Sequence, residues 1–163
     1  MSNMIDSLHT VLSKSYPHQL PLVDRENLSL KETNTTYKLN FGKRRLCVVY
    51  QVDGNIIKVG NKCDYLILAR QDISDKNNEK WKSIFVELKG TDVVHALEQL
   101  DATLDNELFI HSSINEIHAR IVAKSFPANN ANTDFEKAKR KFKKKHKNCT
   151  FKQVSSNQPD TIS

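Results

Sequence analysis

Apolar positions in the first half of the chain fall in short runs separated by polar residues. Such runs occur at 37–41, 46–52, 64–69 and 83–88. This pattern is typical of β-strands. The pair Asp53-Gly54 lies between the second run and a further short run at 55–59, which predicts a tight hairpin turn. The segment 71–80 has Ile73 as its one apolar residue and is expected to be an exposed loop.

Three other segments have the apolar spacing of amphipathic helices. The first covers 4–15, with Ile5, Leu8, Val11 and Leu12 on one face; the second follows Thr91 or Asp92 as N-cap and carries Val93, Leu97, Leu100 and Leu104; the third covers 133–147 and starts near Thr133-Asp134. Residues 17–36 contain two prolines and are expected to connect elements, with a short helical turn around 25–30.

The second half of the chain adds three expected strands, at 107–111, 117–125 and 149–154. The resulting order predicts the α/β class, with a mixed β-sheet flanked by helices. The strand-helix-strand segment from 83 to 125 predicts a parallel strand pair. A chain of 163 residues fits one domain, expected at 1–154, with a basic helix at 133–147 and a flexible tail at 155–163.

Nothing in the sequence indicates membrane insertion or secretion. The apolar runs are far shorter than the roughly 18 residues needed to span a bilayer, and the first residues do not resemble a signal peptide. Cys47, Cys63 and Cys149 are odd in number and widely spaced, so we expect reduced thiols rather than disulfides. The expected location is the cytoplasm.

The net charge of +6 is concentrated in one segment. Residues 137–147 contain eight Lys or Arg and no acidic residue, so the other residues together are net acidic. A run of this density favours contact with nucleic-acid phosphates, and the simpler alternative is a solvated helix face. The side chains expected to make such contacts are Lys139, Arg140, Lys143, Lys144 and Lys145.

Chemistry is most strongly indicated at Glu87-Leu88-Lys89. In a strand, Glu87 and Lys89 leave the same face of the sheet. Placing these charges in so apolar a strand costs desolvation energy unless they are paired or bind a metal. Asp64 begins the neighbouring apolar run, and an antiparallel partner strand brings its carboxylate toward Glu87. The alternatives are a solvent-facing Glu87–Lys89 pair and an Asp64 that caps a turn.

Two neighbouring carboxylates are suited to one hard divalent cation. Mg²⁺ or Mn²⁺ prefers oxygen ligands, retains open positions for water and substrate phosphate, and lowers the pKa of a bound water. Lys89 can then orient that water or offset negative charge on the phosphate. The residues therefore predict a metal-dependent site for phosphodiester hydrolysis.

The segments Lys62-Cys63-Asp64 and Phe85-Val86-Glu87-Leu88-Lys89-Gly90, with the helix after them, resemble the PD-(D/E)XK nuclease superfamily over residues 4–126. The resemblance implies a restriction-endonuclease-like fold and a Mg²⁺ or Mn²⁺ ion held by Asp64, Glu87 and the Leu88 carbonyl. It implies that Lys89 assists the attacking water and that Gln99 contacts the site. An upstream acid, Glu26 or Glu32, could contribute. Cys63 stands where many members have proline.

The expected function is a Mg²⁺-dependent endonuclease that acts on nucleic acid, DNA rather than RNA. One alternative is a catalytically inactive nucleic-acid-binding or scaffold subunit with the same fold. A second is a protein-interaction module whose basic segment docks an acidic protein. Because a small chain with one site cuts both strands most simply as a two-fold pair, a homodimer is a further expectation.

Overall fold

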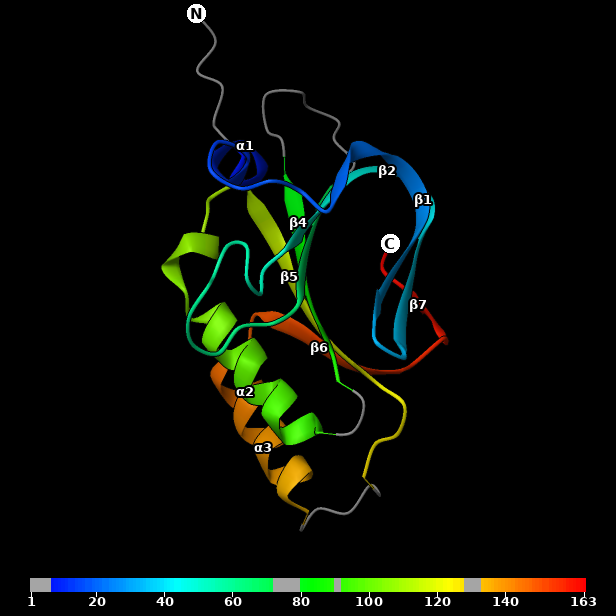
Figure 1. The fold of residues 1–163 in the computed structure, drawn as a ribbon, viewed down its shortest axis with the longest axis vertical. Coiled ribbons are helices and arrows are strands. Elements are labelled where there is room, and N and C mark those ends of the chain that lie inside the picture. The colour runs from blue at the N-terminus through cyan, green and yellow to red at the C-terminus, as the bar shows by residue number, and fades with distance from the viewer. Residues whose placement is uncertain (1–6, 72–79, 90–91, 128–132) are drawn as a thin grey trace, which may run out of the picture.

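The structure is a computed structural model that describes residues 7–71, 80–89, 92–127 and 133–163. A β-sheet runs through the molecule, and helices α2 and α3 lie side by side on one side of it (Figure 1). The elements are α1 (Leu8–Ser13), β1 (Leu20–Glu32), β2 (Thr35–Gln51), β3 (Tyr65–Arg70), β4 (Trp81–Leu88), α2 (Val93–Leu104), the 3-10 helix η1 (Glu107–Phe109), β5 (Ile114–Ala123), α3 (Asp134–Lys145), β6 (Cys149–Ser155) and β7 (Pro159–Thr161).

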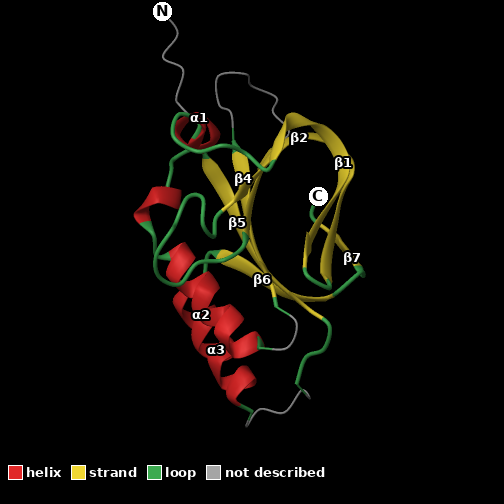
Figure 2. Ribbon diagram, in the orientation of Figure 1, coloured by secondary structure: helices red, strands yellow, loops and turns green. Residues whose placement is uncertain are grey.

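The sheet is mixed, which confirms the α/β class with flanking helices. Its described strands follow the order β1-β2-β3-β4-β5-β6, and β7 pairs with β2. The first three ladders, from β1 to β4, are antiparallel. The β4–β5 and β5–β6 ladders are parallel, so the strand-helix-strand crossover through α2 is confirmed. Figure 2 shows the helices on one side of this sheet and the curled β1–β2 hairpin on the other.

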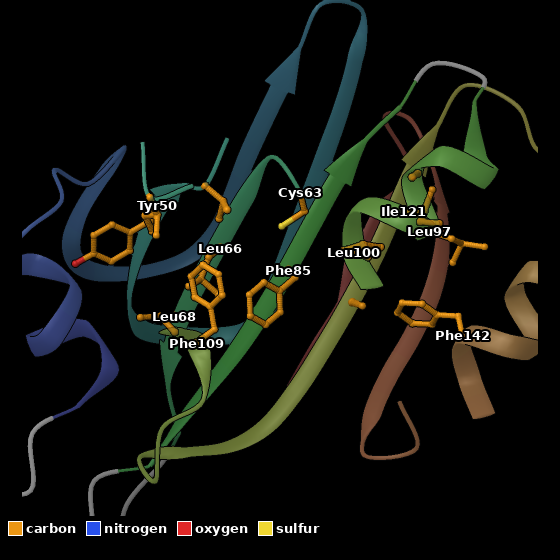
Figure 3. Close-up of a cluster of buried hydrophobic side chains, with 14 of the residues drawn as sticks. Tyr50, Cys63, Leu66, Leu68, Phe85, Leu97, Leu100, Phe109, Ile121 and Phe142 are labelled. Carbon is orange, nitrogen blue, oxygen red and sulfur yellow. The ribbon is translucent and has the colours of Figure 1, made fainter. Parts of the chain in front are cut away.

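Strand β4 is the centre of the fold, because all eight of its residues are buried. On the helix side of the sheet, Phe85 belongs to an apolar cluster with side chains of β3, β5, α2 and α3, including Leu66, Ile121, Leu97 and Phe142 (Figure 3). On the opposite side, Ile84, Val86 and Leu88 pack against the inner face of the β1–β2 hairpin. The sheet therefore has a separate apolar core on each face.

The segment 17–36 is not the expected connection with a helical turn, and this prediction is wrong. Leu20–Glu32 forms β1 and pairs with β2 along a hairpin whose turn lies at Thr33-Asn34. Thr33 has a positive φ of 50°, unusual for a β-branched residue, so the sequence carries no standard turn signal. The expected strands at 37–41 and 46–52 belong to one continuous strand, β2.

The expected hairpin at Asp53-Gly54 is also wrong. The chain does turn there, with Gly54 at a φ of 80° and its N–H donating to the Ile57 carbonyl at 2.9 Å. Residues 55–59 form no strand, however, and Val59 is 88% exposed. Similarly, 107–111 contains a 3-10 turn rather than a strand.

Most elements after residue 60 occur where the sequence predicts them. Strands β3, β4, β5 and β6 are confirmed, as are α2 with Asp92 as N-cap and α3 with Thr133 as N-cap. The first helix is shorter than expected, and Ile5, Thr91 and most of the loop 71–80 lie outside the described residues. No helix in the described part of the chain is long and apolar enough to cross a membrane.

The C-terminal residues form a clamp instead of the expected loose tail. Strand β7 lies parallel to β2, and the Asp160 side chain within it is completely buried. Asp160 Oδ2 accepts hydrogen bonds from the Tyr37 hydroxyl at 2.6 Å and from Arg120 Nε at 2.7 Å. Lys152 Nζ lies 3.2 Å from Oδ1. Asp160 therefore connects the hairpin and the C-terminal residues to strand β5.

We predict that Asp160→Ala destabilises the protein by about 3 kcal/mol, because it leaves the buried Arg120 guanidinium without its counter-charge. Lys152→Met is the control, since Lys152 is 56% exposed and its loss should cost under about 1 kcal/mol. Urea denaturation followed by circular dichroism measures both. Equal losses of stability in the two variants would contradict a stabilising role of the buried Asp160–Arg120 ion pair.

Candidate active site

Asp64 and Glu87 meet at the carboxyl end of β4. Asp64 directly precedes β3, and its N–H donates to the Val86 carbonyl at 3.1 Å. The Leu88 N–H then donates to Asp64 Oδ2 at 2.8 Å. The Asp64 side chain thus replaces a backbone acceptor where the β3–β4 ladder ends. This bond holds the Asp64 carboxylate beside the Glu87-Leu88 peptide.

Glu87 is a buried carboxylate with one unpartnered oxygen. Its side chain is 1% exposed on the helix side of the sheet, and Oε1 has no hydrogen-bond partner. Oε2 lies 3.5 Å from Lys89 Nζ, whose side chain is about a third exposed. Burial and the nearby Asp64 charge raise the pKa of Glu87 to about 9, although Lys89 acts in the opposite direction. Without a cation, Glu87 is protonated at neutral pH.

Asp64 is the more acidic member of the pair. Burial and the charge of Glu32 raise the pKa of Asp64 to about 6, although the hydrogen bond from the Leu88 N–H acts in the opposite direction. Asp64 is therefore mostly ionised at pH 7 while Glu87 is not. The pair carries one negative charge rather than two, so a divalent cation would have to displace a proton on binding.

Glu32 reaches this region from the tip of the hairpin. Its Oε1 accepts a hydrogen bond from the Tyr65 hydroxyl at 2.7 Å, and Tyr65 follows Asp64 directly. Of the two upstream acids suggested by the sequence, Glu32 thus lies near Asp64. Glu26 is exposed on β1 beside the irregular pairing at Arg25/Asn27.

Gln99 lies on a buried side of α2. The sequence separates it from the leucine stripe, yet Ala96 and Thr103 on the same side are fully buried, and Gln99 itself is partly buried. Thr103 Oγ1 donates to the Gln99 carbonyl and accepts from the Cys63 N–H at 2.8 Å, which joins this side of α2 to the residue before Asp64. Gln99 Oε1 is itself buried without a partner.

The basic residues of α3 do not form one uniform surface. Lys139 is mostly buried and donates to Glu136 at 2.9 Å and to Gln153 at 2.6 Å. Lys145 pairs with Asp101 and Asp105 on α2 at 2.9 and 2.6 Å. Arg140, Lys143 and Lys144 are exposed, and Lys143 also lies 5.9 Å from the centre of the Phe151 ring. Four of these five expected phosphate-binding residues are therefore exposed, and Lys145 among them is also ion-paired.

Two groups of neighbouring residues were not predicted from the sequence. Glu87, Ile121 and Gln153 are aligned across β4, β5 and β6, which brings Gln153 to the same sheet face as Glu87. Separately, Asp101, Asp105 and His146 place three potential metal-ligand atoms within 4.8 Å of one another, although Lys145 already binds both carboxylates. Strand register and helix packing create both groupings, and no spacing along the chain signals them.

Two carboxylates, a strand-end peptide and a lysine thus gather at the end of β4, near the side of α2 that carries Gln99. Comparisons with protein-family models, with curated proteins and with solved structures find no match for this chain. The geometry and chemistry of these residues are therefore the basis for assigning a function.

We predict that Glu87→Gln stabilises the metal-free protein at pH 8. Because the pKa of Glu87 is raised to about 9, the folded state holds a proton that the unfolded state releases above pH 4.5. Stability should therefore fall as pH rises from about 4.5 to 9, and the amide removes this loss, worth about 1 kcal/mol or more at pH 8.

Thermal denaturation in chelator at pH 5 and pH 8 tests this prediction. Glu98→Gln is the matched control, because the Glu98 side chain is 59% exposed. An unchanged difference between the two pH values in Glu87→Gln would contradict the raised pKa.

Proposed function

We propose that this protein is a metal-dependent endonuclease that hydrolyses phosphodiester bonds in nucleic acid, with DNA as the preferred substrate. The observation that carries the proposal is the buried, unpartnered Oε1 of Glu87 beside the ionised Asp64. A buried carboxylate oxygen without a hydrogen bond is costly unless a ligand satisfies it.

We also propose that the fold is restriction-endonuclease-like. The PD-(D/E)XK resemblance requires an aspartate next to one strand and Glu-x-Lys at the end of its neighbour, followed by a helix. Strands β3 and β4 are antiparallel neighbours with Asp64 and Glu87 at one end, and α2 follows. This order of elements supports the resemblance.

The donor set fits Mg²⁺ or Mn²⁺. Asp64 and Glu87 offer carboxylate oxygens, as these cations prefer. The Leu88 N–H points toward Asp64, and in an extended strand the carbonyl of the same residue points toward the same neighbouring strand. Asp64, Glu87 and the Leu88 carbonyl would therefore hold the ion. When bound, the ion supplies Lewis acidity and lowers the pKa of a coordinated water.

The other residues position the reactants. The Leu88 N–H fixes the Asp64 carboxylate through its 2.8 Å hydrogen bond. Lys89 Nζ can donate to the attacking water and offset negative charge on the phosphate once Glu87 is engaged elsewhere. The Gln99 side chain has an unpartnered Oε1 and can accept a hydrogen bond from the same water. Their shared role is to orient the nucleophile.

Three exposed cations of α3, Arg140, Lys143 and Lys144, are proposed to bind the phosphate backbone. Contacts of this kind add affinity for any sequence and fix the position of the substrate. A homodimer remains part of the proposal, because each protomer carries one site.

The competing function is an inactive subunit that binds nucleic acid or acts as a scaffold. One observation favours it, since Asp64 already accepts the Leu88 N–H and Glu87 already pairs with Lys89. These contacts could be purely structural, so catalysis must be measured directly.

We predict that Asp64→Asn and Lys89→Ala each reduce cleavage of plasmid DNA in Mg²⁺ or Mn²⁺ by roughly 10²-fold or more. Asparagine keeps an oxygen that can accept from Leu88 N–H, so the fold should survive. Glu98→Gln and Lys14→Gln make the same charge changes at exposed positions and should cleave normally.

Single-stranded DNA and structured RNA are tested beside the plasmid. Absence of cleavage on every substrate, combined with no heat of Mn²⁺ binding in calorimetry, would replace the endonuclease with the inactive subunit.

We predict that Lys144→Gln weakens binding to all DNA sequences alike and reduces the slope of log affinity against log salt by about 0.9. Lys145→Gln should change the slope less, because Asp101 and Asp105 already neutralise Lys145. Fluorescence anisotropy in chelator over a salt series measures both. Identical slopes for the two variants would indicate that DNA affinity depends on the total charge of the protein and not on which lysine is ion-paired.

A further inference from the structure

The outward side of the β1–β2 hairpin has an unusual composition. Its inward side chains, such as Leu30 and Tyr37, are buried in the core. The alternate positions point outward, and the strand register pairs them directly as Asn27 with Asn40, Ser29 with Lys38, and Lys31 with Thr36. We call these six residues the hairpin outer face. Each of its side chains can donate hydrogen bonds, and none is acidic.

This surface has unneutralised positive charge. Lys31 and Lys38 are exposed, and neither has an ion-pair partner among the described residues. Asn27 and Ser29 are likewise exposed. Asn40 is used internally, because its Oδ1 accepts the Gly42 N–H at 2.7 Å where the strand bends. The remaining donors and the two free ammonium groups face solvent and favour an anionic, acceptor-rich partner.

The hairpin is held rigidly in relation to the candidate active site. At its tip, Glu32 bonds to Tyr65, which follows Asp64. Farther along, Tyr37 bonds to Asp160, which is tied in turn to Arg120 of β5. In Figure 1 the end of β4 lies between the helices on one side and this hairpin on the other. The hairpin therefore has a fixed position on the side of the sheet opposite to α2 and α3.

We propose that the hairpin outer face enters the major groove of duplex DNA, an inference that rests on the proposed endonuclease function. Strands β1 and β2 form a two-stranded ribbon with a spacing of about 4.8 Å, and the short β7 pairs with β2 at Lys38, Leu39 and Asn40. The major groove of B-DNA is about 12 Å wide and admits a two-stranded β-ribbon. Lysine can donate to guanine, asparagine can bond to adenine, and serine or threonine can bond to either.

The same geometry excludes duplex RNA as the preferred partner. The major groove of A-form RNA is deep and too narrow for side chains to enter. The hairpin outer face thus selects duplex DNA over duplex RNA of the same sequence. This role differs from that of the exposed cations of α3. Those cations contact the phosphate backbone of the nucleic acid, and such contacts do not distinguish the grooves of DNA from those of RNA.

The test uses the full chain, a labelled 20-base-pair DNA duplex and fluorescence anisotropy in chelator, so that no cleavage occurs. The double variant Lys31→Gln/Lys38→Gln should bind about tenfold more weakly than the parent. Lys14→Gln/Lys58→Gln removes the same charge at exposed positions outside the hairpin and should change affinity much less. The parent should prefer DNA over the matching RNA duplex, and the hairpin variant should lose most of that preference.

Asn27→Ala/Ser29→Ala provides a charge-neutral check and should weaken duplex DNA binding as well. Methylation of guanine N7, which lies in the major groove, should reduce binding of the parent and affect the lysine variant little. Equal losses in the hairpin and control double variants, or equal binding of DNA and RNA duplexes, would overturn the inference. Cleavage that persists and still depends on Asp64 would then leave the endonuclease proposal standing.

Discussion

The burial of β4 on both faces is the constraint on which the rest of the structure depends. All of its residues are buried, so the chain must supply helices on one side and a long curled hairpin on the other. Glu87 lies within this strand, where a carboxylate loses several kcal/mol of solvation. Its raised pKa is the direct consequence, because protonation is the alternative to a bound cation. The burial of β4 therefore determines both the packing of the core and the raised pKa of Glu87.

Sequence patterns could predict the part of the fold that surrounds this strand. The elements β3, β4, α2 and β5 have strong apolar periodicity, and Asp92 supplies a standard N-cap. Two antiparallel strands joined by a polar segment necessarily bring their facing ends together, so the meeting of Asp64 with Glu87 followed from strand order alone. Local signals and the long-range arrangement agree in this region, and such agreement makes an element predictable.

The hairpin and the C-terminal strand could not be predicted because long-range pairing determines them. The apolar–polar alternation in Leu28-Ser29-Leu30-Lys31 is too short to predict strand β1 when two prolines precede it. Asp53-Gly54 is a strong signal for a hairpin turn, but the residues after it form no strand. Asp160 is one carboxylate in a polar terminal segment, and only its bonds to Tyr37 and Arg120 give it importance. Glu32 reaches the Asp64 region by the same folding of the hairpin.

The basic segment illustrates how tertiary contacts divide a charge cluster that is uniform in sequence. Lys139 turns inward to Gln153, and Lys145 turns to the carboxylates of α2, because Phe135 and Phe142 fix the rotation of the helix against the core. Of the eight basic residues in this segment, Lys139 alone is not exposed, and the exposed ones lie on the helix side of the sheet. The free lysines of the hairpin lie on the opposite side. Positive charge therefore flanks the end of β4 from two directions, although the sequence concentrates it in one segment.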